Sequence, residues 1–160
     1  MFVRDLQTGT TTRVSVASDG TQANYDVDCG YPAISADGRY VAFSSLATNL
    51  VPGDTNGCAD TFVHDRATGV TTRASVAADG TQANGGSSGS IIERATAISS
   101  DGRYVAFASR ASNLVAGDTN GTQDVFVRDR ISGTTSRVSV SSSGEQGNSE
   151  SGSPSISADG

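Results

Sequence analysis

The sequence predicts an all-β protein: an arc of a β-propeller made of four-stranded antiparallel blades. Three observations lead to this prediction. Landmark sequences recur at intervals of roughly 60 residues, each interval holds four short strand-like segments, and the second of these segments is apolar on both faces. A repeated sheet with one doubly buried strand is typical of sheets packed around a common axis.

Three sets of landmarks repeat along the chain, each with small changes. The spacing varies only after the asparagine that ends the third set, so the variable stretch is expected to be a loop. The landmarks are FVRD or FVHD at Phe2, Phe62 and Phe126; ISADG or ISSDG at Ile34, Ile98 and Ile156; and SDGTQAN, ADGTQAN or SSGEQGN ending at Asn24, Asn84 and Asn148.

Four strand-like segments make up the repeat that begins near Pro32. They are PAIS from Pro32, RYVAFSS from Arg39, TFVHD from Thr61 and TTRASV from Thr71. β-Branched and aromatic residues are frequent in them, as strands prefer. The intervening turns ADGR and RATGV have the Asp-Gly or Thr-Gly composition of tight hairpins. Each repeat is therefore predicted to be a four-stranded antiparallel sheet.

The second segment carries Tyr40, Val41, Ala42 and Phe43 in succession, so both of its faces are apolar. A strand of this kind is expected between two neighbouring sheets. The third and fourth segments are more polar, which is consistent with radial packing from a buried inside to a wetter outside. A stacked β-solenoid is the main alternative fold, but its coils are shorter than about 60 residues and lack paired hairpin turns.

The segments SADGRYVAFSS and DTFVHDRATG carry a resemblance to a known family. They resemble the TolB-like, WD-type β-propeller repeat, in which a Ser-x-Asp-Gly turn leads into a strand like RYVAFSS and then into a strand of the form D-[IV]-[FY]-V-x-D. The resemblance covers nearly the whole chain. It implies a propeller that makes protein–protein contacts, often in a bacterial envelope.

The repeats divide the chain into parts of one partial β-propeller domain over residues 1–160. We expect a partial blade at 1–30, full blades at 31–77 and 95–140, and the start of a further blade at 153–160. The second strand and the loop after it occur only twice, so the chain cannot close a ring of the usual four to eight blades. The sequence therefore predicts a fragment of a larger propeller, whose partners include the remaining blades.

The strand order places the two kinds of connection on opposite faces. The tight turns share one face, and the longer loops share the other. Long loops on a rigid frame often carry function. On this face the segment NLVPGDTNGCADTFVHDR at 49–66 has a near copy, NLVAGDTNGTQDVFVRDR, at 113–130.

Asp and Asn alternate around a glycine in both copies, as they do in calcium-binding loops. Ca²⁺ takes six to eight oxygen ligands from a tightly curved chain. The match lacks a third acidic residue and the glutamate of an EF-hand, so we expect weak affinity. The alternative is that these side chains cap turns through Asx hydrogen bonds. The candidate ligands are Asp54, Asn56, Asp60, Asp118, Asn120 and Asp124.

Cys29 and Cys58 are both expected on the long-loop face, where a disulfide is geometrically feasible, with two free thiols as the alternative. His64, the single histidine, is expected at the surface of an outer strand. Arg66 and Arg130 are expected to pair with nearby carboxylates at the sheet edge.

No catalytic residue is predicted, because the polar residues recur in every repeat and a catalytic site needs one asymmetric arrangement. The net charge of −6 disfavours nucleic acid as a partner. No apolar run is long enough to insert into a membrane, and no targeting segment is visible.

The sequence is consistent with two functions that belong to different classes. The first is a non-catalytic module that serves as a protein-binding or structural scaffold, stiffened by Ca²⁺ and secreted, periplasmic or at the cell surface. The second is a fragment of a propeller enzyme, such as a polysaccharide lyase, a glycosidase or a peptidase-associated domain, with its active site in other blades.

Overall fold

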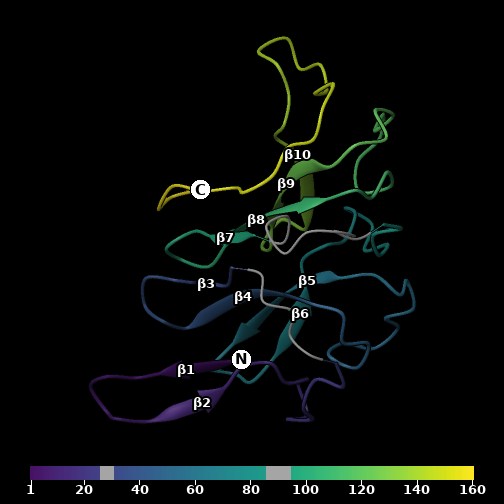
Figure 1. The fold of residues 1–160 in the computed structure, drawn as a ribbon. Helices are drawn as coiled ribbons and strands as arrows, with labels where there is room; N and C mark the ends of the chain where they lie inside the picture. Colours follow the sequence, from purple (N-terminus) through teal and green to yellow (C-terminus); the bar gives the residue numbers. More distant parts are fainter. Residues whose placement is uncertain (26–30, 86–94) are drawn as a thin grey trace.

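The computed structural model describes residues 1–25, 31–85 and 95–160, and within these ranges it holds strands and no helix. The strands form three antiparallel sheets that lie one above another in Figure 1. The sheets are β1 (Phe2–Arg4) with β2 (Thr11–Arg13); β3 (Ala33–Ile34), β4 (Tyr40–Ser45), β5 (Asp60–Asp65) and β6 (Thr71–Arg73); and β7 (Thr96–Ile98), β8 (Tyr104–Ser109), β9 (Asp124–Asp129) and β10 (Thr134–Arg137).

Both four-stranded sheets keep their strands in chain order and share one register. Phe43 lies opposite Phe62 in the first sheet, and Phe107 lies opposite Phe126 in the second. These sheets are β-propeller blades, so the predicted fold is confirmed. Their strands lie within the ranges 31–77 and 95–140, and the hairpin of β1 and β2 lies within 1–30.

Residues 153–160 do not form the strand expected at the start of a further blade. The first strand of a blade pairs with the second strand, as β3 does with β4, and the described residues hold no second strand to pair with Ile156. The turn that follows still repeats the contact of its counterpart. The Ser100 amide donates to the Ala158 carbonyl at 2.9 Å, just as the Ala36 amide donates to the Ser100 carbonyl at 3.1 Å.

Each blade buries a pair of phenylalanines against its own long loop. The rings of Phe43 and Phe62 lie 5.9 Å apart between centroids, and Leu50 of the loop packs on them. The same separation joins Phe107 and Phe126. A further cluster, made of Ala42, Val63 and Ala74 with Val105 and Ile98, packs the two blades on each other.

β5 is buried along its whole length. The expectation of a wetter third strand is therefore wrong for this blade, and so is the surface position expected for His64, which is 5% exposed. β5 lies inside the sheet, and its polar groups have partners there. His64 Nδ1 lies 2.9 Å from Thr71 Oγ1, whose hydroxyl donates to the Val16 carbonyl at 2.6 Å and thereby links two sheets.

The tight turns lie together on one face, as predicted. In Figure 1 the β3–β4 and β7–β8 turns are on the left and the longer β4–β5 loop is on the right. The Arg39 guanidinium donates Nε and Nη2 to the two oxygens of Asp65, both at 2.8 Å. Arg66 instead donates Nη1 to the Gly38 carbonyl at 2.6 Å. The arginine paired with Asp65 is thus Arg39, and the described residues show no ion pair within 4 Å for Arg66.

A tyrosine and a glycine join the two blades at this face. Gly102 turns the chain with φ of +73°, and the ring of Tyr40 from the neighbouring blade lies directly over its Cα. A side chain at residue 102 would overlap that ring. The Arg130 guanidinium covers the same ring at 4.6 Å from the centroid. We name this arrangement of glycine, tyrosine and arginine the turn socket.

Candidate functional site

The acidic loop residues of the first blade gather around an arginine. Arg73 ends β6, and its Nη1 lies 3.4 Å from Asp60 Oδ2 while its Nη2 lies 3.7 Å from Asp54 Oδ1. Asn56 Nδ2 donates to Asp60 Oδ2 at 3.0 Å. The side chains of Arg73, Asp54 and Asp60 are 7%, 3% and 0% exposed. The fold therefore brings the three predicted ligands together, with a buried positive charge among them.

The second blade repeats this arrangement. Arg137 Nη1 lies 3.3 Å from Asp118 Oδ1 and 3.5 Å from Asp124 Oδ2. Asn120 Nδ2 donates to Asp124 Oδ2 at 2.9 Å. The two loops are thus two copies of one structure, which we name the arginine clusters: Arg73 with Asp54, Asn56 and Asp60, and Arg137 with Asp118, Asn120 and Asp124.

Residues of the fourth strand and the following loop complete each cluster. Ser75 Oγ donates to Asp60 Oδ1 at 2.5 Å. Arg73 Nη1 donates to Gln82 Oε1 at 2.6 Å, and Gln82 Nε2 donates to Thr55 Oγ1 at 2.6 Å. The sequence pattern of the loop alone does not identify these residues. Their recurrence as Arg137, Ser139 and Gln146 was the available signal.

Burial acts on the pKa of three acidic groups in the clusters, Asp54, Asp60 and Asp118. It raises the pKa of the Asp54 carboxyl, while the Arg73 charge acts in the opposite direction. It also raises the pKa of the Asp60 carboxyl, against the opposing effects of the Ser75 hydrogen bond and the Arg73 charge. In the second copy, burial and the nearby Asp124 charge raise the pKa of Asp118. Each buried carboxylate pair therefore depends on its arginine for compensation.

The arginine clusters fit a resident Ca²⁺ ion poorly. Asn56 turns its NH₂ group toward Asp60, and its Oδ1 accepts the Cys58 amide at 3.0 Å, so its amide oxygen is engaged by the loop itself. The guanidinium of Arg73 already supplies a positive charge beside both carboxylates. Within residues 1–25, 31–85 and 95–160, no group of three or more His, Cys, Asp or Glu side chains is arranged to hold a metal.

Asparagines connect each long loop to the preceding repeat. The Asn24 side chain accepts the Thr48 amide at 3.0 Å through Oδ1 and donates Nδ2 to Thr48 Oγ1 at 2.9 Å. In return, Asn49 Oδ1 accepts the Asn24 amide at 2.9 Å, and its Nδ2 donates to the Gln22 carbonyl at 2.8 Å. Asn84 and Asn113 make the same exchange further along the chain. We name these pairs the asparagine clasps.

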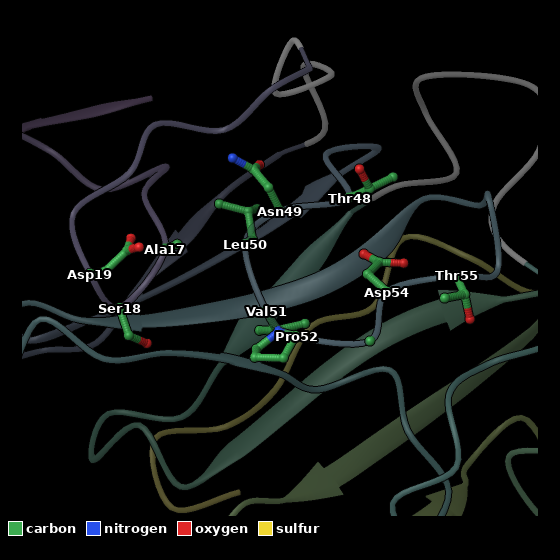
Figure 2. Close-up of a pocket in the computed structure, with 11 residues that line it drawn as sticks. Ala17, Ser18, Asp19, Thr48, Asn49, Leu50, Val51, Pro52, Asp54 and Thr55 are labelled. Atoms are coloured by element: carbon green, nitrogen blue, oxygen red, sulfur yellow. The ribbon is translucent and has the colours of Figure 1, made fainter.

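A groove of about 500 Å³ lies beside the first long loop. Figure 2 shows its two sides: Asp19 with Ala17 and Ser18 on one, and residues 48–55 on the other. A second hollow of about 380 Å³ lies across the same loop and includes Arg73 and Gln82. The long-loop face is therefore indented, and Val51, Pro52 and Gly53 line both hollows.

Cys58 is half-buried in the first long loop. Its thiol is free in the structure, as in the alternative of two free thiols. Cys29 lies outside the described residues. The parts of the chain that the structure describes hold no helix long and apolar enough to cross a membrane.

Comparison with known proteins supports the fold. No known family profile and no curated protein matches the chain. Among solved structures, it is similar to TolB from Acinetobacter baumannii with a TM-score of 0.51 and 19% identity, over 99% of this chain and 29% of that one. It is also similar to a putative TolB from Agrobacterium tumefaciens, with a TM-score of 0.48 and 18% identity, over 93% of this chain and 44% of that one. The chain thus spans less than half the length of either protein and resembles part of the TolB β-propeller.

Proposed function

We propose that this chain is a non-catalytic β-propeller module that serves as a protein-binding or structural scaffold. The observation that carries the proposal is the arginine cluster and its recurrence, with corresponding residues, in the second blade. In both copies the polar side chains of the long loop hold the loop closed. A catalytic site needs groups that are free to act on a substrate in one asymmetric arrangement. Residues repeated in every blade serve the frame instead.

The indented long-loop face is the surface on which we place a protein partner. Val51 and Pro52 line two hollows, and loops held on a rigid scaffold are common binding surfaces. An exported location, in a bacterial periplasm or at a cell surface, belongs to the same proposal and rests on the resemblance to TolB alone.

Weak Ca²⁺ binding by the two long loops also remains a proposal. Its support is the pair of Asp carboxylates that each loop brings close to one place. The ion would have to compete with the guanidinium of Arg73 or Arg137, so binding by the native chain should be weak.

Site-specific photocrosslinking tests the scaffold function. A photoreactive residue at Pro52 should crosslink one defined protein in the host, whereas the same residue at Ser132, in the exposed β9–β10 turn on the opposite face, should not. The purified pair should then bind in solution, and Val51→Asp should weaken that binding. Turnover of polysaccharide or peptide substrates by the purified chain, lost on substitution of a long-loop residue, would overturn the proposal.

A further inference from the structure

One edge of β1 is open among the described residues. The corresponding strands β5 and β9 each have a second neighbour, and β1 lacks the contacts that this neighbour makes. β1 pairs only with β2 among the described residues, whereas β5 pairs with both β4 and β6. We propose that this edge is a docking site for one β-strand of the type Arg-Tyr-x-x-Phe, the pattern of residues 39–43. An extended segment that joins an open sheet edge gains main-chain hydrogen bonds, and its alternate side chains give specificity.

Phe2 lacks the aromatic partner that its counterparts have. It is 58% exposed, whereas Phe62 and Phe126 are fully buried against Phe43 and Phe107. The Arg13 guanidinium lies 4.8 Å from the centroid of the Phe2 ring. A phenylalanine from an added strand would cover the ring and bury a large apolar area.

A groove is open where that strand would lie. It has a volume of about 250 Å³ between β1 and the next blade, and its lining includes Phe2, Val3, Ile34 and Val41. Ile34 is 49% exposed. Its counterpart Ile98 packs against the cluster of Ala42 and Val63, which the preceding blade supplies. The groove is therefore apolar and has the place of a second strand.

Asp5 lacks the arginine that its counterparts have. Asp65 accepts two hydrogen bonds from Arg39, and Asp129 accepts two from Arg103. Asp5 accepts the backbone amides of Gln7 and Thr8, and the described residues give it no bidentate arginine. Its carboxylate is placed to pair with an arginine that precedes the tyrosine of the added strand.

In the first blade, the glycine and the arginine of a turn socket are present, but the tyrosine is missing. Gly38 has the same positive φ as Gly102, but its Cα faces open space apart from Arg66 Nη1, where Gly102 is covered by Tyr40. Arg66 Nε is buried without a hydrogen-bond partner among the described residues. Its counterpart Arg130 covers the Tyr40 ring. A tyrosine from the added strand would fill the socket against Arg66.

A single strand satisfies all four positions in one register. β4 pairs with β5 so that Tyr40 lies opposite Asp65 and Phe43 opposite Phe62. The same spacing on β1 places the tyrosine opposite Asp5 and the phenylalanine opposite Phe2. The partner is therefore a second strand of the same repeat type. This docking edge is separate from the long-loop face, so it stands or falls independently of the proposed function.

A labelled peptide of residues 38–45, GRYVAFSS, tests the proposal by fluorescence anisotropy with the full chain. We expect saturable binding and slowed amide exchange at Phe2–Arg4. Asp5→Ala should weaken binding at least about tenfold, since a hydrogen bond to a charged group is lost. The peptides with arginine or tyrosine replaced by alanine should lose a similar factor. Asp79→Ala changes an exposed turn aspartate of the next blade, away from this edge; it is the matched control and should bind normally.

Binding that is equal for a scrambled peptide, or unchanged by Asp5→Ala in a protein with wild-type circular dichroism, would overturn the proposal. So would self-association of the chain through β1 that the peptide does not displace. Asp5→Asn provides a second variant, because it keeps acceptors for the Gln7 and Thr8 amides while it removes the charge. It should retain the fold and lose the arginine-dependent part of the binding.

Discussion

The ring of Tyr40 lies over Gly102 of the neighbouring blade, so closely that residue 102 has no room for a side chain. Gly38 occupies the same turn position in its own blade with φ of +71°, against +73° for Gly102, and no ring covers it. The two glycines therefore share a backbone conformation and differ in their packing. Substitution of Gly38 therefore reports the cost of a left-handed backbone alone, whereas substitution of Gly102 adds the cost of overlap between blades.

Gly102→Ala should destabilise the chain more than Gly38→Ala. The left-handed backbone alone costs roughly 1–2 kcal/mol for alanine, and displacement of Tyr40 adds roughly 1–3 kcal/mol of overpacking. Urea unfolding of both variants measures the difference. Equal losses of unfolding free energy would mean that the Tyr40 contact does not join the blades in solution.

Arg73→Ala should be among the most destabilising single changes in the chain. It leaves the buried carboxylates Asp54 and Asp60 without a compensating charge, and loss of one partner of a buried pair costs about 3–5 kcal/mol. Arg13 is the matched control, because it holds the same position in the β1–β2 hairpin but is exposed over Phe2. Arg13→Ala should cost less than about 1 kcal/mol. Chemical denaturation would contradict the buried-pair account if both variants lost the same stability.

Calcium should stabilise the chain more strongly once the clusters lose their arginines. Thermal melts with and without millimolar Ca²⁺ should show a small rise in Tm for the native chain, and a larger one for Arg73→Gln with Arg137→Gln. A ligand at about ten times its Kd adds roughly 1.4 kcal/mol. Adding Asp54→Ala and Asp118→Ala should abolish the response. A Ca²⁺ response that survives these changes would place the ion elsewhere.

His64 should make stability fall as the pH drops below about 6.5, the ordinary value for histidine. Burial lowers the pKa of His64, so the folded chain holds the neutral ring, and protonation favours the unfolded state. The stability that His64 contributes is fully present above its pKa in the unfolded chain. It is lost progressively as the pH falls toward its lower pKa in the folded chain.

The variant His64→Gln isolates this effect. Between pH 7.5 and 5, the unfolding free energy of this variant should decrease by less than that of the native chain. Arginine hydrogen bonding lowers the pKa of Asp65, so loss of that ion pair begins at more acidic pH in both proteins. Parallel pH profiles for the two proteins would show that His64 does not titrate on unfolding.

The repeat made the fold predictable, because strand segments, tight turns and their order recur with the same spacing. It also placed Asp54, Asn56 and Asp60 on one face, where the structure brings them together. The buried arginine among them escaped prediction. Arg73 is far from the loop in sequence, and its direction depends on which side of β6 faces the cluster.

The burial of His64 escaped prediction for a related reason. Its position holds arginine in the other repeats, which suggests a surface, yet Arg128 is also half-buried and donates to the Ala77 carbonyl of the preceding blade. A polar residue on a middle strand lies inside when the adjoining sheet supplies acceptors. Single-sequence patterns do not contain that contact between sheets.

The asparagine clasps determine where the gene can be cut when these repeats are duplicated or exchanged. Ala23 and Ala83, next to the clasp asparagines, pack into the core of the following sheet, so a sheet cut out at its own strand ends would leave its neighbour with a missing core residue. A breakpoint at the end of the long loop, just before the third strand, by contrast keeps each clasp and its alanine together with the loop they hold. Recombination of such genes should therefore be tolerated best when the exchanged piece is offset by half a blade.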